Sequence, residues 1–220
     1  MERAIDVQLE ELKKLILVMG GHVEQALNLV ATALQSKDSI KFEKVRDLEK
    51  QINADHMSVD NVCLNLLAKQ GPVAKDLRLI LSIIKINTDL ERMGDQCMNI
   101  SYNGREYLTR SAISHADTID EMAKLAKTMV KSSLDSFVRG DVVLAKQVLA
   151  MDDQVDQLKN QIFNTLTEHM KKNSSDVEGS LNLILIARNL ERLGDHATNI
   201  AEDVIFALTG KDIRHGGLHV

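Results

Sequence analysis

LERMGDQCMNI at residues 90–100 returns as LERLGDHATNI at residues 190–200, with seven of the eleven positions identical. This repeat, at a separation of 100 residues, indicates that the chain arose by internal duplication. Each copy holds Glu, Asp and Asn at successive steps of four, and residues four apart lie above one another on an α-helix. We call these rows of oxygen-bearing side chains the carboxylate ladders: Glu91, Asp95 and Asn99, and Glu191, Asp195 and Asn199.

The composition is that of an all-α protein. Aromatic residues make up only 3% of the 220 residues and there is one proline, while 44% of the residues are apolar and 27% are charged. Such a composition is typical of helical proteins rather than of β-sheets. The net charge of −5 offers no basic surface for nucleic acid, so we expect no nucleic-acid partner.

The sequence also predicts where in the cell the protein is found. Cys63 and Cys97 share no short spacing, which argues against a zinc knot or a disulfide framework and predicts small buried side chains in a reducing environment. The first residues lack the basic start and apolar run of a signal peptide. We find no apolar run approaching the roughly 20 residues that span a bilayer, so we expect a cytoplasmic protein without direct membrane insertion.

Sparse breaks divide the chain into six predicted helices. They fall at Ser36 to Asp38, Gly71-Pro72, Thr109 to Asp117, Gly140-Asp141, Lys172 to Asp176 and Gly210. Each predicted helix is about 25 to 35 residues long with helical periodicity. Short turns make successive helices antiparallel, so we expect two tandem three-helix bundles at residues 1–112 and 113–210, then a C-terminal tail at 211–220.

The third and sixth predicted helices carry apolar residues at alternating steps of three and four, as in Leu90, Met93, Cys97 and Ile100. A seam of this kind is typical of helices packed nearly parallel or antiparallel. Gly94 and its counterpart in the second half interrupt these helices at a cost of roughly 1 kcal/mol each. We therefore expect close approach of another backbone or of a ligand at both glycines.

The preceding helix of each half carries a second row of polar side chains. Glu49 and Asn53 flank Ile52 in the first half, and Asp152 and Asp156 flank Val155 in the second. When residues are counted from each intervening turn at 1.5 Å per residue, the two rows of each half lie level to within about 3 Å. Each half is therefore predicted to gather four oxygen-bearing side chains at one height.

Two interpretations of these groups remain open: a metal site, and a surface salt-bridge network centred on Arg92 and Arg192. Position 92 lies about 100° around the helix from Glu91, so we expect Arg92 not to point along the ladder, which favours metal. Oxygen ligands suit magnesium, manganese, calcium or ferric iron better than structural zinc.

Nothing beside the ladders indicates catalysis. The chain has no Glu-x-x-His pair of the kind that builds di-iron sites in helical bundles, and we identify no catalytic residue, general base or nucleophile there. We expect a binding or regulatory protein, not an enzyme. Two further side chains are predicted to be structural: Asp55 at a partly exposed seam edge or in a local salt bridge, and His196 in a surface role.

Taken together, several stretches closely resemble the PhoU family over nearly the whole chain. They are MGGHVEQAL at 19–27, GPVAKDLRLI at 71–80, both ladder segments, and GKDIRHGG at 210–217. The resemblance implies two tandem PhoU domains, often assembled as homodimers, and multinuclear iron or other metal ions such as manganese, magnesium or zinc on the outer surface. By position, the implied metal ligands are Glu49, Asn53, Glu91 and Asp95, and Asp152, Asp156, Glu191 and Asp195. Asn53 departs from the acidic pattern, which makes the first site the less anionic.

The resemblance further implies a function that the residues alone would not name. Members of this family are not known as enzymes. They repress phosphate uptake and the phosphate-starvation response by linking the high-affinity phosphate transporter, through its ATPase subunit, to a phosphate-sensing histidine kinase. An alternative from another class is a carboxylate-metal enzyme or a metal-storage protein that uses the same ladders.

Overall fold

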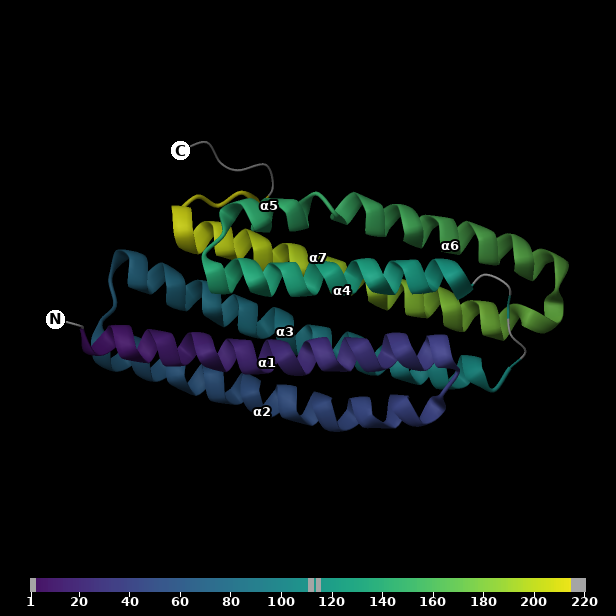
Figure 1. The fold of residues 1–220 in the computed structure, drawn as a ribbon, viewed down its shortest axis with the longest axis horizontal. Coiled ribbons are helices and arrows are strands. Elements are labelled where there is room, and N and C mark those ends of the chain that lie inside the picture. The colour runs from purple at the N-terminus through teal and green to yellow at the C-terminus, as the bar shows by residue number, and fades with distance from the viewer. Residues whose placement is uncertain (1–2, 111–112, 114–115, 215–220) are drawn as a thin grey trace.

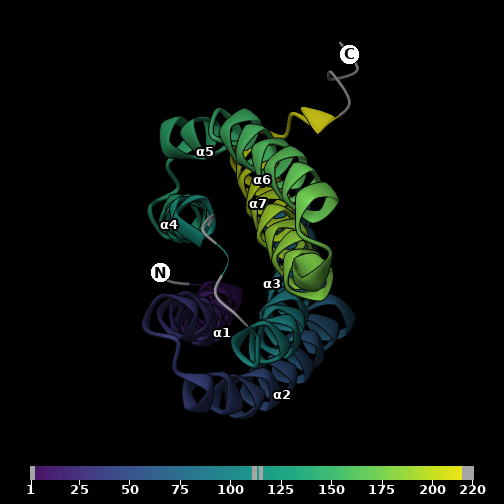
Figure 2. The same ribbon diagram turned by 90° about the vertical axis from the view of Figure 1, so that its right-hand side faces the viewer.

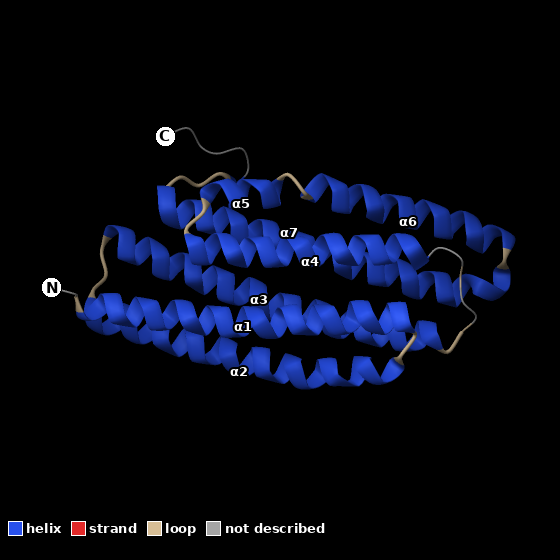
Figure 3. Cartoon of the chain, in the orientation of Figure 1, coloured by secondary structure: helices blue, strands red, loops and turns tan. Residues whose placement is uncertain are grey.

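The computed structural model describes residues 3–110, 113 and 116–214, and this part of the chain folds into helices joined by short turns (Figure 3). The elements are α1 (Ala4–Ser36), α2 (Ser39–Gln70), α3 (Ala74–Leu108), α4 (Ala116–Arg139), α5 (Val142–Leu149), α6 (Asp152–Lys172), the short 3-10 helix η1 (Ser174–Asp176) and α7 (Val177–Thr209). The all-α prediction is confirmed. Residues 215–220 of the predicted C-terminal tail lie outside the described residues.

The helices form two bundles in tandem, α1 to α3 and α4 to α7, which lie side by side along their length (Figures 1 and 2). Successive long helices run antiparallel, as the short turns predicted. The bundles meet most extensively where α3 packs on α7, and again where α1 packs on α4. The predicted apolar seams form the core: Leu90, Met93, Cys97, Leu190 and Leu193 have no exposed surface.

The same cap begins the second element of each half. Asp38 Oδ1 accepts a hydrogen bond from the Ile40 backbone N–H at 3.1 Å, and Asp141 Oδ1 accepts one from Val143 at 2.9 Å. An aspartate in this position pairs one of the free N–H groups of the first turn and stabilises a helix by about 1 kcal/mol. The duplication therefore extends to how the helices begin.

The prediction of six helices is wrong in the second half, where the fifth segment splits into α5 and α6. Ala150 and Met151 form a turn between them, and α6 begins with Asp152 and Asp153. Negative side chains in a first turn interact favourably with the helix dipole. The aspartates that belong to the predicted site therefore also favour a helix start at this point, whereas α2 runs unbroken through the corresponding region of the first half.

Helix α1 corrects the expectation that no segment is apolar enough to span a membrane. By length and composition alone, Ile5–Ser36 would suffice. In the structure Leu12, Ile16, Met19 and Val23 are fully buried, and α1 packs against α2, α3 and α4. One face of α1 is thus part of the protein core, while Val7 and Val18 on the helix remain exposed.

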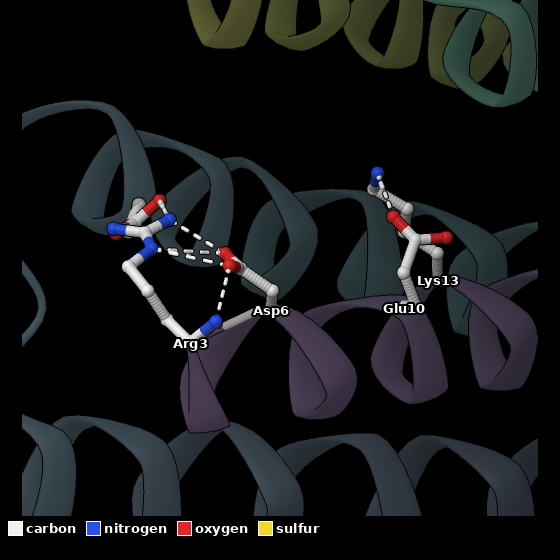
Figure 4. A network of polar contacts seen from close by, with 5 residues as sticks. Arg3, Asp6, Glu10 and Lys13 are labelled. Atoms are coloured by element: carbon white, nitrogen blue, oxygen red, sulfur yellow. Dashed lines mark hydrogen bonds and ion pairs between the residues drawn. The ribbon is translucent and has the colours of Figure 1, made fainter. Parts of the chain in front are cut away.

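The start of α1 is tied to the start of α3 by an exposed ion-pair network (Figure 4). The Arg3 guanidinium donates to the Asp6 carboxylate at 2.6 Å and to the Asp76 carboxylate at 2.8 Å. Through these contacts the start of α1 lies beside the α2–α3 turn. The α1–α2 turn is at the opposite end of the first bundle (Figure 1).

Candidate functional site

One close contact in each half shows where along the helices the predicted site lies. A Cβ atom on Gly94 would lie 3.1 Å from Ile52 Cδ1, and one on Gly194 would lie 3.5 Å from Val155 Cγ1. The glycines of α3 and α7 therefore admit a side chain of the preceding helix, and this side chain stands in place of the close backbone that the sequence led us to expect. Ile52 and Val155 are the residues that the second polar rows flank, so the level rows predicted for both halves are present.

In the second half the rows meet around a lysine. Lys159 Nζ, on α6, donates to Asp156 Oδ1 at 2.7 Å and to Glu191 Oε1, on α7, at 2.8 Å. We call Asp152, Asp156, Glu191 and Asp195, with Lys159 among them, the second carboxylate cluster. Lys159 was missed in the sequence because a lysine one turn from an aspartate is usual on any solvated helix face.

The pKa values show how crowded this cluster is. Partial burial, followed by the negative charges of Glu191 and Asp152, raises the pKa of Asp195 to about 6. Burial and the charges of Asp156, Asp153 and Glu191 also raise the pKa of Asp152. The single ammonium of Lys159 does not neutralise four carboxylates, so the cluster still favours an added cation.

The first half is arranged differently. Asn53 Nδ2 donates to Glu49 Oε1 at 2.6 Å on α2, and Arg92 lies 3.4 Å from both Glu91 and Asp95 on α3. The expectation that Arg92 would point away from the ladder is wrong, because its long side chain bends back over its own helix. Three carboxylates with an arginine and an amide leave less uncompensated negative charge here than in the second cluster.

The outer asparagine of the second ladder contacts the first bundle instead. Asn199 Nδ2 donates to Asp89 Oδ1 at 3.2 Å, and His196 Nδ1 lies 2.8 Å from the same oxygen. Asp89 belongs to α3, so His196 joins the two bundles and is only 19% exposed, which corrects its predicted surface role. Asp55 is partly exposed, as predicted, and pairs with His22 of α1 at 2.7 Å.

The fit of a metal ion can be judged from these donors. Among the described residues, no three or more carboxylate, histidine or cysteine side chains are already arranged to hold one. In the second cluster, however, the Lys159 ammonium stands where a cation would sit, between oxygens of two helices. Carboxylate oxygens are the ligands of hard cations, so this cluster fits an ion if Lys159 moves aside.

Comparison with known proteins covers the whole of this architecture. The PhoU domain family matches residues 16–103 and 119–204. A phosphate-specific transport system accessory protein PhoU homolog from Pseudomonas aeruginosa is 36% identical, over 97% of this chain and 88% of its own length. The phosphate-specific transport system accessory protein PhoU of Escherichia coli is 31% identical, over 96% and 88%.

Solved structures agree with the sequence comparison. The crystal structure of PhoU from Pseudomonas aeruginosa superposes with a TM-score of 0.91 at 34% identity, over 93% of this chain and 99% of that one. The phosphate transport system regulatory protein PhoU from Streptococcus pneumoniae gives a TM-score of 0.87 at 28% identity, over 94% and 98%.

Proposed function

This chain is a member of the PhoU family, and from that premise we propose that it is a non-catalytic accessory protein that regulates phosphate transport. The observation that carries the proposal is the match of both bundles, in order, to relatives that the chain covers almost from end to end. Those relatives are named as accessory or regulatory proteins of phosphate transport. A shared fold alone would not support a function, but here the sequence agrees over the same length.

The finer role that we propose is repression. The protein would act in the cytoplasm, hold the high-affinity phosphate transporter in check through its ATPase subunit, and keep a phosphate-sensing histidine kinase inactive while phosphate is plentiful. A pair of packed bundles with broad outer helix faces suits an adaptor that contacts two partners at once. We expect it to act as a homodimer.

We further propose that metal ions bind the carboxylate rows. In the second half the ligands would be Asp152, Asp156, Glu191 and Asp195, and in the first half Glu49, Asn53, Glu91 and Asp95. A bound ion would supply positive charge where like charges crowd, with iron, manganese, magnesium and zinc as the candidates. The support is the raised pKa of Asp195 and the position of the Lys159 ammonium.

A gene deletion tests the regulatory role. Cells without this protein should keep a phosphate-starvation promoter active and take up phosphate rapidly in phosphate-rich medium, and the wild-type gene should restore repression. Normal promoter activity and normal uptake in the deletion strain would refute the proposal.

Metal analysis tests the carboxylate rows separately. Protein purified without chelator should contain iron, manganese, magnesium or zinc, and the double variant Asp95→Asn, Asp195→Asn should lose most of it while circular dichroism shows an intact fold. Metal that stays bound in the folded double variant would place the ions elsewhere.

A further inference from the structure

A cavity of about 370 Å³ lies between α6 and α7, beside the second carboxylate cluster. Its apolar lining comes from Ile162 and Phe163 of α6 and from Ile184, Leu185 and Ala187 of α7, and the ion-paired Lys159 and Glu191 also line it. Pockets of a few hundred Å³ with apolar walls and a few polar groups are the usual shape of binding sites. The regulatory role proposed above leaves this cavity unexplained.

Large apolar side chains around the cavity face solvent. Phe163 is 52% exposed, Leu181 is 47% exposed and Leu185 is 40% exposed. Single exposed apolar residues are ordinary, but a group of them on neighbouring helices marks an interaction surface. Removing such side chains from water is favourable, so a partner that covers the group would gain affinity.

The duplication supplies an internal control for this surface. Ile52 and Val155 occupy matching places against Gly94 and Gly194, so α6 residues match α2 residues 103 positions earlier and α7 residues match α3 residues 100 positions earlier.

In the first half the three positions that match Phe163, Leu185 and Ala187 are polar, and each makes a hydrogen bond or an ion pair. Phe163, Leu185 and Ala187 correspond to Asp60, Lys85 and Asn87. Asn87 Nδ2 donates to Asp60 Oδ1 at 2.9 Å and to the His56 carbonyl oxygen at 3.1 Å. Lys85 reaches Asp203 of the other bundle at 3.2 Å. Polar contacts therefore occupy the first-half groove, and an open apolar cavity occupies the second.

The charges beside the cavity indicate what kind of partner fits. Leu181, Leu185, Arg188 and Arg192 succeed one another at steps of four, three and four, which places them along one face of α7. In the described part of the chain neither arginine pairs with a carboxylate, whereas Arg92 pairs with two. This face of α7 is thus apolar at one end, and at the other end it carries two arginines without a carboxylate partner among the described residues.

We propose that the α6–α7 groove, formed by Phe163, Leu181, Leu185, Arg188 and Arg192, is the docking surface for an amphipathic helix of a partner protein. The helix inserts a large apolar side chain into the cavity and places Asp or Glu residues against Arg188 and Arg192. Helices bind grooves in this way through anchors spaced by three and four residues. The proposal rests on the proposed function only in assuming that the protein acts through partners.

An anionic membrane fits this surface less well. The cavity is concave and is lined by side chains of both α6 and α7, whereas the surface of a bilayer is flat on this scale and would cover the cavity without filling it. A helix can follow the groove and direct its own charges to the arginines.

Peptide binding to the full-length protein tests the proposal. The probe is a fluorescein-labelled designed helix of about 18 residues, five turns long, with Leu at spacings of three and four and Glu on the same face one to two turns beyond. Phe163→Asp and Leu185→Lys, which install the first-half residues, should each weaken binding by about 10-fold or more. Met57→Asp, on an equally exposed apolar side chain of α2, is the matched control and should leave binding unchanged.

Charge reversal tests the arginines. Arg188→Glu should weaken binding of the Glu peptide by about 10-fold and strengthen binding of the same peptide with Lys in place of Glu. The proposal would be overturned if Met57→Asp and Phe163→Asp weakened peptide binding equally, or if Arg188→Glu left the affinity for both peptides unchanged. So would a shift from dimer to monomer in Phe163→Asp, or loss of binding to vesicles of anionic phospholipid in that variant, since these would assign the groove to a second copy or to a membrane.

The cell assay separates this proposal from the proposed function. In the deletion strain, the wild-type gene and Met57→Asp should restore repression, and Phe163→Asp and Leu185→Lys should not, with equal protein levels. Full repression by Phe163→Asp would refute the docking surface and leave the regulatory role standing. A deletion strain without any phenotype would instead refute the regulatory role.

Discussion

Replacing Asp195 with asparagine should stabilise the metal-free protein at neutral pH, although the substitution removes a charged residue from the candidate site. The pKa of Asp195 is raised from 3.8 to about 6, by burial first and then by Glu191 and Asp152. A carboxyl group whose pKa is higher in the folded state favours folding while it is protonated, and it loses that contribution as the pH rises through 6. At pH 7.5 the ionised Asp195 therefore lowers the free energy of unfolding.

The size of the effect follows from the same shift. About two pKa units correspond to roughly 3 kcal/mol as an upper limit. Asp195 keeps one side open to solvent, and screening at such a position reduces the expected gain to about 1 kcal/mol. For a protein of this size that gain raises the melting temperature by about 2–4 °C.

Thermal and urea unfolding in excess EDTA, from pH 4 to pH 8, would measure this gain. Asp195→Asn should be the more stable protein at pH 7.5, and the difference should shrink towards zero as the pH falls from 6 to 4. The matched variant is Asp95→Asn, which loses a pair with Arg92 at 3.4 Å and should be destabilised by about 0–1 kcal/mol. Destabilisation by Asp195→Asn at pH 7.5, or an equal gain at pH 4, would refute the crowding of carboxylates in the second cluster.

Three further outcomes are expected. Gly104→Ala should lower the free energy of unfolding by about 1–3 kcal/mol because a Cβ there would clash with the buried ring of Phe42. Gly21→Ala, with open space around it, should raise the free energy of unfolding by about 0.5–1 kcal/mol. Urea titration compares the two variants, and changes of the same sign would contradict the packing. Lys159→Met should tighten manganese binding in calorimetry by about 10-fold, since the ammonium no longer competes for Asp156 and Glu191, and unchanged affinity would place the ion elsewhere. Burial raises the pKa of Cys97 to about 12, so its thiol should resist iodoacetamide at pH 8 in the folded protein and react in urea; rapid reaction of the folded protein would show that α3 opens readily.

Much of the fold could be predicted from the sequence because helical periodicity and short turns are local properties. Steps of three and four placed Leu90 and Met93 in the core, and counting residues from the turns placed the two polar rows of each half at one height, where Ile52 lies against Gly94. The split between α5 and α6 was missed because the apolar pattern continues across it, while the helix start at Asp152 depends on only a few polar side chains.

The charge partners could not be predicted in the same way. Arg92 lies 100° from Glu91 on its helix, yet its flexible side chain reaches both ladder carboxylates. Among the described residues, Arg192, the counterpart of Arg92, forms no ion pair with its ladder carboxylates. Lys159 of the neighbouring helix pairs with Asp156 and Glu191 instead. A long side chain pairs with whichever acceptors the neighbouring helix brings within reach, so two similar motifs gave two different clusters.

The sequence by itself determined the duplication, the helical class, the level of the carboxylate rows and the resemblance to the PhoU family, because each depends on spacing along one helix or across one turn. Only the tertiary structure decided that His196 meets Asp89, 107 residues away, and that α6 and α7 leave an apolar cavity between them. The first feature arises where helices of the two bundles come together and the second where two neighbouring helices of one bundle pack, and neither geometry can be read from spacing along a single helix.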